Sequence, residues 1–318
     1  MTPDLDDTVR ALSSIFCPLI PAKIDRLFAH CHVLVTLFDK IRRGAHSAAP
    51  PKFFIKVSIM SQPKNPTAAI IVIGDEILSG RTKDKNIGWL AENLSAQGIQ
   101  LGEARVIADN RQVIIDTVQT LSAAYDLVFT SGGIGPTHDD ITTEAVAAAF
   151  HVPVIRHPEA ERRLVAHYAN TDLEFNAARQ KMADIPATAT LIDNPLSAAP
   201  GFILGNVHVL PGVPAILQAM FEGLRSSLPG GVVMTRITVQ CGTGEGNIAT
   251  ILATVQSRYE GVSIGSYPWF KPGQFGTAVV VSGLDRAATE SAAKDVEAEV
   301  RLFGADAQIV DADGVPIR

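Results

Sequence analysis

Residues 126–144 read DLVFTSGGIGPTHDDITTE. The run DLVFT is short and apolar, as in a buried strand, and it leads directly into three glycines and a proline. The next residues, ITTEAVAAAF, predict a helix over 141–150. A strand that passes through a glycine-rich loop into a helix is typical of α/β proteins, and the free N–H groups of the helix start can bind an anion.

The chain before this loop has the same alternation of strand and helix. The run AAIIVI at 68–73 is continuously apolar and ends at a glycine, which predicts a strand buried on both faces. The order and spacing of these elements predict a right-handed parallel sheet. Ligands of such sheets bind at the carboxyl ends of the strands, so residues 74–86 and 131–140 form the candidate site. The other elements expected here are helices over 84–97 and 111–123 and a strand over 99–108.

The rest of the chain divides at Pro229-Gly230-Gly231, which we expect to separate two domains. Residues 67–229 form the first domain, and residues 232–318 predict a small α+β domain. The elements expected between the loop and this boundary are helices over 158–168 and 173–183, strands over 190–193, 201–204 and 207–210, and a last helix after LPGVP at 210–214.

Bulk composition excludes several classes of protein. The net charge is −6 and no basic stripe is present, so we expect no nucleic-acid binding. No apolar run reaches the roughly 18 residues that a transmembrane helix needs, so we expect no membrane partner. Three cysteines without a C-x-x-C pair fit a reducing cytoplasm better than a disulfide scaffold. Residues 1–66 are expected to be an amino-terminal extension, with Met60 as the natural start and 1–59 from an over-extended reading frame. A genuine helical appendage is the alternative.

The loop carries the residues of an anion site. Gly132, Gly133 and Gly135 remove side chains where a backbone approaches a ligand or takes positive φ, and Ser131 and Thr137 offer hydroxyl donors. The glycine spacing is neither the dinucleotide-binding nor the P-loop pattern.

Asp139 and Asp140 admit two interpretations. Either one of them caps the following helix, or both hold a divalent cation that bridges them to a bound phosphate, as Mg²⁺ does. Asp75 or Glu76, at the end of the first strand, could complete the metal coordination or act as a base, or could be turn carboxylates in solvent.

Residues in the loop after the first strand offer further ligand contacts. We expect Arg81 to bind an anion, whereas Asp84 and Asn86 suit either capping or ligand recognition.

Five motifs occur in order along the chain, with GSYPWF (265–270) as a further one in the tail. They are GDEILSGRTKDKN (74–86), TSGGIGPTHDDITTEAVA (130–147), FNAARQKMADIP (175–186), NPLSAAPGF (194–202) and LPGVP (210–214). Together they resemble the MoaB/Mog molybdopterin-binding family, in the branch of the amino-terminal region of the competence/damage-inducible protein CinA. The resemblance covers residues 67–305. The amidase domain that follows in CinA has no counterpart before the chain stops at Arg318, so we do not expect nicotinamide-nucleotide deamidation.

The resemblance implies a three-layer α/β/α sandwich with a mostly parallel sheet, in a homo-oligomer of two or three copies. In pterin-handling members the glycine loop holds the pterin phosphate and aspartates assist Mg²⁺-dependent adenylylation. The CinA branch is implicated in splitting ADP-ribose. The Mog branch commonly has Arg where this chain has Asp139, a departure that favours a phosphoanhydride site over pterin. The matching positions here are Gly132, Gly133, Gly135, Asp140 and Asp84.

The leading hypothesis is a cytoplasmic, metal-dependent pyrophosphatase, a hydrolase of a nucleoside diphosphate-linked substrate such as ADP-ribose. Asp139, Asp140 and Asp75 would hold Mg²⁺, Mn²⁺ or Co²⁺, and metal-bound water would attack the anhydride. The loop glycines, Thr137 and Arg81 would bind phosphate oxygens. The alternatives are a protein that binds molybdopterin or a nucleotide without turnover, an adenylyl-transfer protein of molybdenum cofactor biosynthesis, and a scaffold with a relict site. Three further residues would neutralise the leaving phosphate: Asn176, Arg179 and Lys181. The alternative is that they form a solvated face of a helix.

Overall fold

The structure is a computed structural model that describes residues 65–311 and residue 315. The expectations for residues 1–59 lie outside this range. Within it, no helix is long and apolar enough to cross a membrane.

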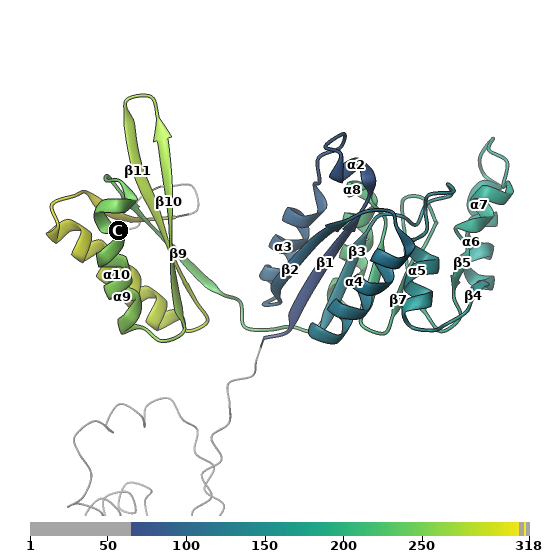
Figure 1. The fold of residues 1–318 in the computed structure, drawn as a ribbon, viewed down its shortest axis with the longest axis horizontal. Coiled ribbons are helices and arrows are strands. Elements are labelled where there is room, and N and C mark those ends of the chain that lie inside the picture. The colour runs from purple at the N-terminus through teal and green to yellow at the C-terminus, as the bar shows by residue number, and fades with distance from the viewer. Residues whose placement is uncertain (1–64, 312–314, 316–318) are drawn as a thin grey trace, which may run out of the picture. The chain divides into compact units, whose positions relative to one another are not determined.

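The first domain is built on a six-stranded sheet in the order β2-β1-β3-β8-β7-β6 (Figure 1). The first four strands are parallel to one another, and β7 and β6 continue the sheet as antiparallel neighbours. The strands are β1 (Thr67–Ile73), β2 (Gln100–Ile107), β3 (Leu127–Ser131), β6 (Thr190–Ile192), β7 (Gly201–Leu204) and β8 (Val207–Leu210). The expected mostly parallel sheet is confirmed.

Strand β1 explains why helices cover both faces of this sheet. Every residue from Ala68 to Ile73 is buried, and alternate side chains enter different cores. Ile71 packs in the core with α4 (Arg111–Ala124), α5 (Thr142–Ala149) and α6 (Pro158–Tyr168). Ile70 packs on the opposite face with α3 (Asn86–Ala96) and α8 (Pro214–Leu224). Each such isoleucine contributes roughly 1.5–3 kcal/mol by burial.

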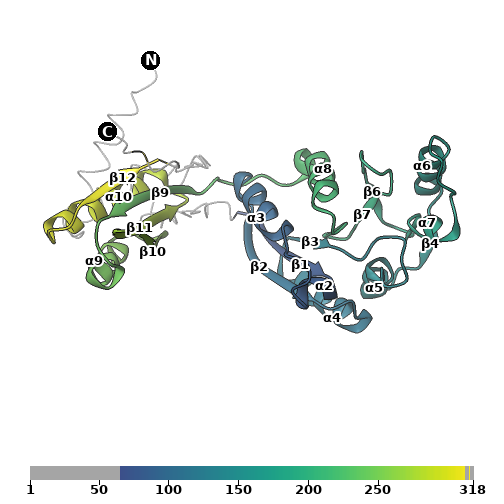
Figure 2. The ribbon, with the colours of Figure 1, turned by 90° about the horizontal axis from the view of Figure 1, so that it is seen from above.

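Figure 2 shows the resulting three layers, with α8 on one side of the sheet and α4 and α5 on the other. The expected α/β/α sandwich is confirmed. Short elements that sequence patterns did not predict complete the domain. They are α2 (Asp75–Leu78), the antiparallel pair β4 (Val154–Arg156) and β5 (Asp184–Pro186), and the 3₁₀ turn η1 (Arg225–Ser227).

The helix expected over 173–183 is wrong in its extent. The structure has only α7 (Ala177–Lys181), because the Asn176 side chain accepts the Arg179 N–H and so caps the helix start. The helix expected from residue 84 likewise begins at Asn86. Asp84 stands before it, and its carboxylate accepts the N–H groups of Asn86 and Ile87.

The chain enters and leaves the first domain at the same place. The Asn65 side chain donates from Nδ2 to the Val232 carbonyl (2.7 Å) and accepts the Val232 N–H at Oδ1 (2.9 Å). The Gly231 N–H also donates to the Gln97 carbonyl at 2.9 Å. These bonds hold Asn65, just before β1, and Gln97 against residues 231 and 232, which follow η1.

The second domain is a separate α+β unit with its own core. Its four-stranded antiparallel sheet has the order β10-β11-β9-β12, and both helices pack in one core with it. The β10–β11 hairpin pairs along all ten residues of each strand. The elements are β9 (Thr235–Cys241), α9 (Glu245–Arg258), β10 (Val262–Lys271), β11 (Gln274–Gly283), α10 (Arg286–Leu302) and β12 (Ala307–Val310).

His208 makes the stability of the first domain depend on pH. It lies on β8, is 6% exposed, and stacks on Phe129 with ring centroids 4.8 Å apart. Burial lowers the pKa of His208, so the unfolded chain binds a proton more readily than the folded protein. The folded state therefore keeps its full stability above about pH 6.5, the pKa of an unfolded histidine, and loses stability as the pH falls below it.

We expect His208→Leu to flatten this loss of stability between pH 8 and pH 5. Urea unfolding at several pH values measures it. His151→Asn is the matched control, because His151 is exposed with φ of 56°, a conformation that asparagine tolerates. A wild-type pH slope that survives in His208→Leu would contradict the assignment.

Candidate functional site

A cavity of about 640 Å³ opens where β1, β2, β3 and β8 end. Its walls come from the loop after β1, the residue Asp109 after β2, the glycine loop after β3 and the Pro211–Pro214 turn after β8. This is the position expected for the ligand of a parallel sheet. Of the residues predicted from the sequence, those that line it are Glu76, Asp84, Asn86, Ser131, Gly132, Gly133, Gly135, Asp139 and Asp140.

The three loop glycines are required by the loop's own fold. Gly132 and Gly133 have φ of 113° and 69°, values that side-chain-bearing residues rarely adopt. A Cβ on Gly132 would overlap the Ile73 carbonyl, and one on Gly133 would overlap the Thr142 hydroxyl. A Cβ on Gly135 would press on the Asp140 carboxylate. Close approach of a ligand is therefore not the only reason for these glycines, because the packing of the loop itself also requires them.

Asp140 stabilises the loop itself and does not cap the helix after it. Its Oδ2 accepts the Thr137 N–H at 2.8 Å and also the Thr137 hydroxyl. The N-cap of α5 is Ile141, which has no side-chain capping bond. The interpretation of these aspartates as caps of α5 is therefore wrong. Thr137, expected to bind phosphate, is bonded to Asp140 and does not line the cavity.

Asp109 is a cavity carboxylate that sequence analysis missed. Its Oδ2 accepts the Asp75 N–H at 2.9 Å, which ties the end of β2 to the start of α2. Burial raises the pKa of Asp109, and the nearby charges of Asp75, Glu76 and Asp139 raise it further. The signal was its place directly after a predicted strand, the same signal that drew attention to Asp75. Asp75 itself is exposed and does not line the cavity.

Asn86 connects three loops beneath the cavity. Its Nδ2 donates to the Ser131 hydroxyl (2.8 Å) and to the Gly212 carbonyl (2.9 Å), while its own backbone opens α3. The residue is 4% exposed, and its Oδ1 has no hydrogen-bond partner in the described chain. Asn86 thus fixes the floor of the site and leaves one acceptor atom unused.

Basic side chains are distributed differently from what the sequence suggested. Lys83 and Lys85 line the cavity, although neither was predicted as a site residue. Arg81 is exposed outside the cavity lining.

The FNAARQK residues also lie outside the main cavity. Asn176 caps α7, and Arg179 donates to the Glu174 carbonyl and lies over the Tyr168 ring. Lys181 donates to two carbonyls of the glycine loop.

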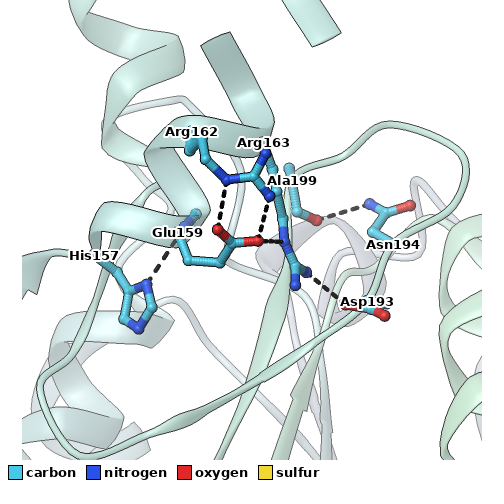
Figure 3. Close-up of polar contacts among 8 residues, drawn as sticks. His157, Glu159, Arg162, Arg163, Asp193, Asn194 and Ala199 are labelled. Carbon is cyan, nitrogen blue, oxygen red and sulfur yellow. Dashed lines mark hydrogen bonds and ion pairs between the residues drawn. The ribbon is translucent and has the colours of Figure 1, made fainter. Parts of the chain in front are cut away.

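The NPLSAAPGF motif forms another wall. Asn194 donates from Nδ2 to the Ser197 hydroxyl and the Ala199 carbonyl, and its Oδ1 accepts two N–H groups of the same turn. The preceding residue, Asp193, pairs with Arg163, which also donates to Glu159 on α6 (Figure 3).

This ionic chain ties the wall to α6. Arg162 and Arg163 together lower the pKa of Glu159 to about 2, so Glu159 is ionised whenever the protein is folded near neutral pH. The link to the wall itself runs through Arg163 and the exposed Asp193 side chain, so this ion pair contributes little to stability.

The donor set of the cavity suits a divalent cation bound jointly with a phosphate. Among residues 65–311, no three His, Cys, Asp or Glu side chains form a cluster able to hold a metal by themselves. Mg²⁺, however, is usually bound by one or two carboxylates together with substrate phosphates. The carboxylates that line the cavity are Glu76, Asp84, Asp109, Asp139 and Asp140.

Residues 69–229 match the family described as "Probable molybdopterin binding domain", which is just over half of the 318 residues. The chain belongs to this family. The resemblance drawn from the sequence motifs is thereby confirmed. Residues 232–303, the second domain of this molybdopterin-binding-family protein, match "FAD synthase, middle domain".

The chain is also similar to individual known proteins. A CinA-like protein of Parasynechococcus marenigrum (strain WH8102) is 31% identical over 243 residues, which is 73% of this chain and 57% of that protein. A protein named "Probable FAD synthase" from Caenorhabditis briggsae is 32% identical over 247 residues, 70% of this chain and 47% of that protein. The chain thus spans about half the length of these two relatives. The crystal structure of CinA from Thermoplasma acidophilum is 32% identical with a TM-score of 0.48, covering 51% of this chain and 98% of that one.

The glycine loop of this family member yields a stability test. We expect Gly133→Ala to lower the free energy of unfolding by about 2–4 kcal/mol, because it combines left-handed backbone strain with a clash against Thr142. Gly80→Ala is the matched control. Gly80 has φ of 74° and open space around it, so strain alone should cost about 1 kcal/mol. Urea unfolding measures both, and equal losses would show that the clash with Thr142 is absent.

Proposed function

We propose that the protein hydrolyses the phosphoanhydride bond of a nucleoside diphosphate-linked substrate with the help of a divalent cation. The observation that carries the proposal is one cavity with a glycine loop at a helix start, five carboxylates and two lysines. Carboxylates and lysines that line one cavity suit a diphosphate with a bound divalent cation, because the carboxylates can bind the cation and the lysines can bind the phosphates.

The cation would be held by Asp139 with Asp140 or Asp109. Asp75, the third ligand expected from the sequence, lies outside the cavity lining and acts through its N–H bond to Asp109. A bound divalent cation would neutralise charge on the phosphates and would lower the pKa of a water molecule bound to it.

The chain's own residues would hold and orient the diphosphate. Lys83 and Lys85 supply positive charge on the loop after β1, and the glycine loop after β3 borders the same cavity. Ile77, Ile134 and Ile216 give the remaining wall an apolar character that suits a flat ring.

The match of residues 232–303 to a domain of FAD synthase widens the substrates worth testing. FAD and ADP-ribose both carry AMP on a diphosphate, so hydrolysis of either anhydride releases AMP. The relative named as a probable FAD synthase supports including FAD beside ADP-ribose.

We expect the purified protein to release AMP from ADP-ribose or FAD when Mg²⁺, Mn²⁺ or Co²⁺ is present, and to stop when the metal is chelated. Asp139→Asn should lower the rate on the order of a hundredfold or more, since it removes a carboxylate that faces the phosphates. Asp172→Asn, which changes an exposed aspartate outside the cavity, is the matched control. Chromatographic measurement of AMP decides the result, and full activity in Asp139→Asn would refute its role.

Binding of molybdopterin or a nucleotide without turnover is the second candidate. Two observations favour it: the family description, and the engagement of the Asp140 carboxylate by Thr137, which leaves fewer free oxygens for a metal. Calorimetry that shows tight binding of a pterin phosphate, together with no release of AMP from ADP-ribose or FAD, would select this candidate over the first.

A further inference from the structure

The FNAARQK motif at 175–181 carries three polar side chains that sequence analysis assigned to phosphate, yet each is bonded to protein. Asn176 caps α7 by accepting the Arg179 N–H at 3.1 Å. The Arg179 guanidinium donates to the Glu174 carbonyl and lies 5.2 Å from the centre of the Tyr168 ring. These contacts hold the start of a five-residue helix that would be marginal alone.

Lys181, at the end of this helix, reaches the glycine loop. Its Nζ donates to the Asp140 carbonyl at 2.8 Å and to the Thr137 carbonyl at 3.0 Å, across 41 and 44 residues of chain. The same two residues close the turn from inside, because the Thr137 N–H donates to the Asp140 carboxylate. Two of the three ammonium donors are therefore spent on one turn of the loop.

We propose that Lys181 is a positioning residue that clamps the Thr137–Asp140 turn, and that the FNAARQK motif serves as its brace. The clamp fixes the orientation of the peptide units that precede α5, and with them the direction in which Asp139 faces the cavity. Hydrogen bonds from an ammonium to carbonyls are stronger than neutral ones, so one lysine is enough to order a short turn.

This assignment differs from that of a phosphate ligand in a measurable way. Loss of a phosphate ligand leaves the loop of the free protein unchanged, whereas loss of a clamp disorders that loop even without substrate. The effect on catalysis rests on the proposed hydrolase function, but the effect on loop order does not.

Amide hydrogen exchange of the full chain without ligand tests the clamp. We expect Lys181→Met to accelerate exchange in peptides covering residues 135–141 by about tenfold or more, the ratio implied by losing one or two charge-assisted bonds. Peptides from β1 and α4 should keep the wild-type rate. Lys181→Arg, which retains donors, should restore most of the protection, and Asn176→Ala, which loosens α7, should give a smaller increase at the same residues.

Lys294→Met is the matched control, because Lys294 is an exposed lysine on α10. Unchanged exchange at 135–141 in Lys181→Met would overturn the proposal. Equal acceleration throughout the first domain would also overturn it, since that pattern indicates global destabilisation and no local clamp.

Kinetics extend the test if the wild type releases AMP. Lys181→Met should then lower kcat more than it raises the KM for ADP-ribose, and Lys181→Arg should recover much of kcat, because the clamp orients Asp139 and does not touch the substrate. A wild type without turnover would refute the proposed function and leave the exchange result to decide the clamp.

Discussion

The burial of β1 on both faces is the constraint from which the rest of the first domain follows. Six consecutive apolar residues, Ala68–Ile73, leave no side of this strand for water, so helices must cover the sheet above and below. Parallel neighbours need crossover helices, and these bring every strand-to-helix loop to the same edge. The cavity lies at that edge, between the loops that follow β1, β2, β3 and β8.

Loops that meet at such an edge must still be fixed in position relative to one another. Asn86 does so for three of them with a single amide, and Asp109 joins a fourth to the start of α2. The glycine loop has a different kind of order. Its conformation depends on the lack of side chains at Gly132 and Gly133. It also depends on the Asp140 carboxylate, which binds Thr137 within the turn, and on Lys181, which binds the turn from the end of α7.

The sequence predicted the sheet, the position of the site and most long elements, since these depend on periodicity and on glycine. Helix α6 has the expected bounds because Pro158 starts it and its apolar face is regular. The helix expected over 173–183 is confined to α7 because Asn176 takes a capping conformation, a choice that composition does not reveal. The three-residue strands β4 and β5 are too short for any periodic signal.

Individual site residues were harder to predict, for a physical reason. The charge of Lys181 suggested a phosphate partner, but its true partners are backbone carbonyls 41 and 44 residues away, and carbonyls are invisible in sequence. Asp109 was overlooked because its importance comes from three other carboxylates that only the sheet brings near.

The pairing of Asn65 with Val232 has a consequence for how this domain could be used. Because its first and last residues are joined by two hydrogen bonds, the domain is a closed loop of chain with adjacent ends. Such a unit can be grafted into a surface turn of a host protein, or have its ends linked and be reopened elsewhere, without stretching the backbone. The two hydrogen bonds of the Asn65 amide thus keep the ends of the domain adjacent, as insertion into another protein requires.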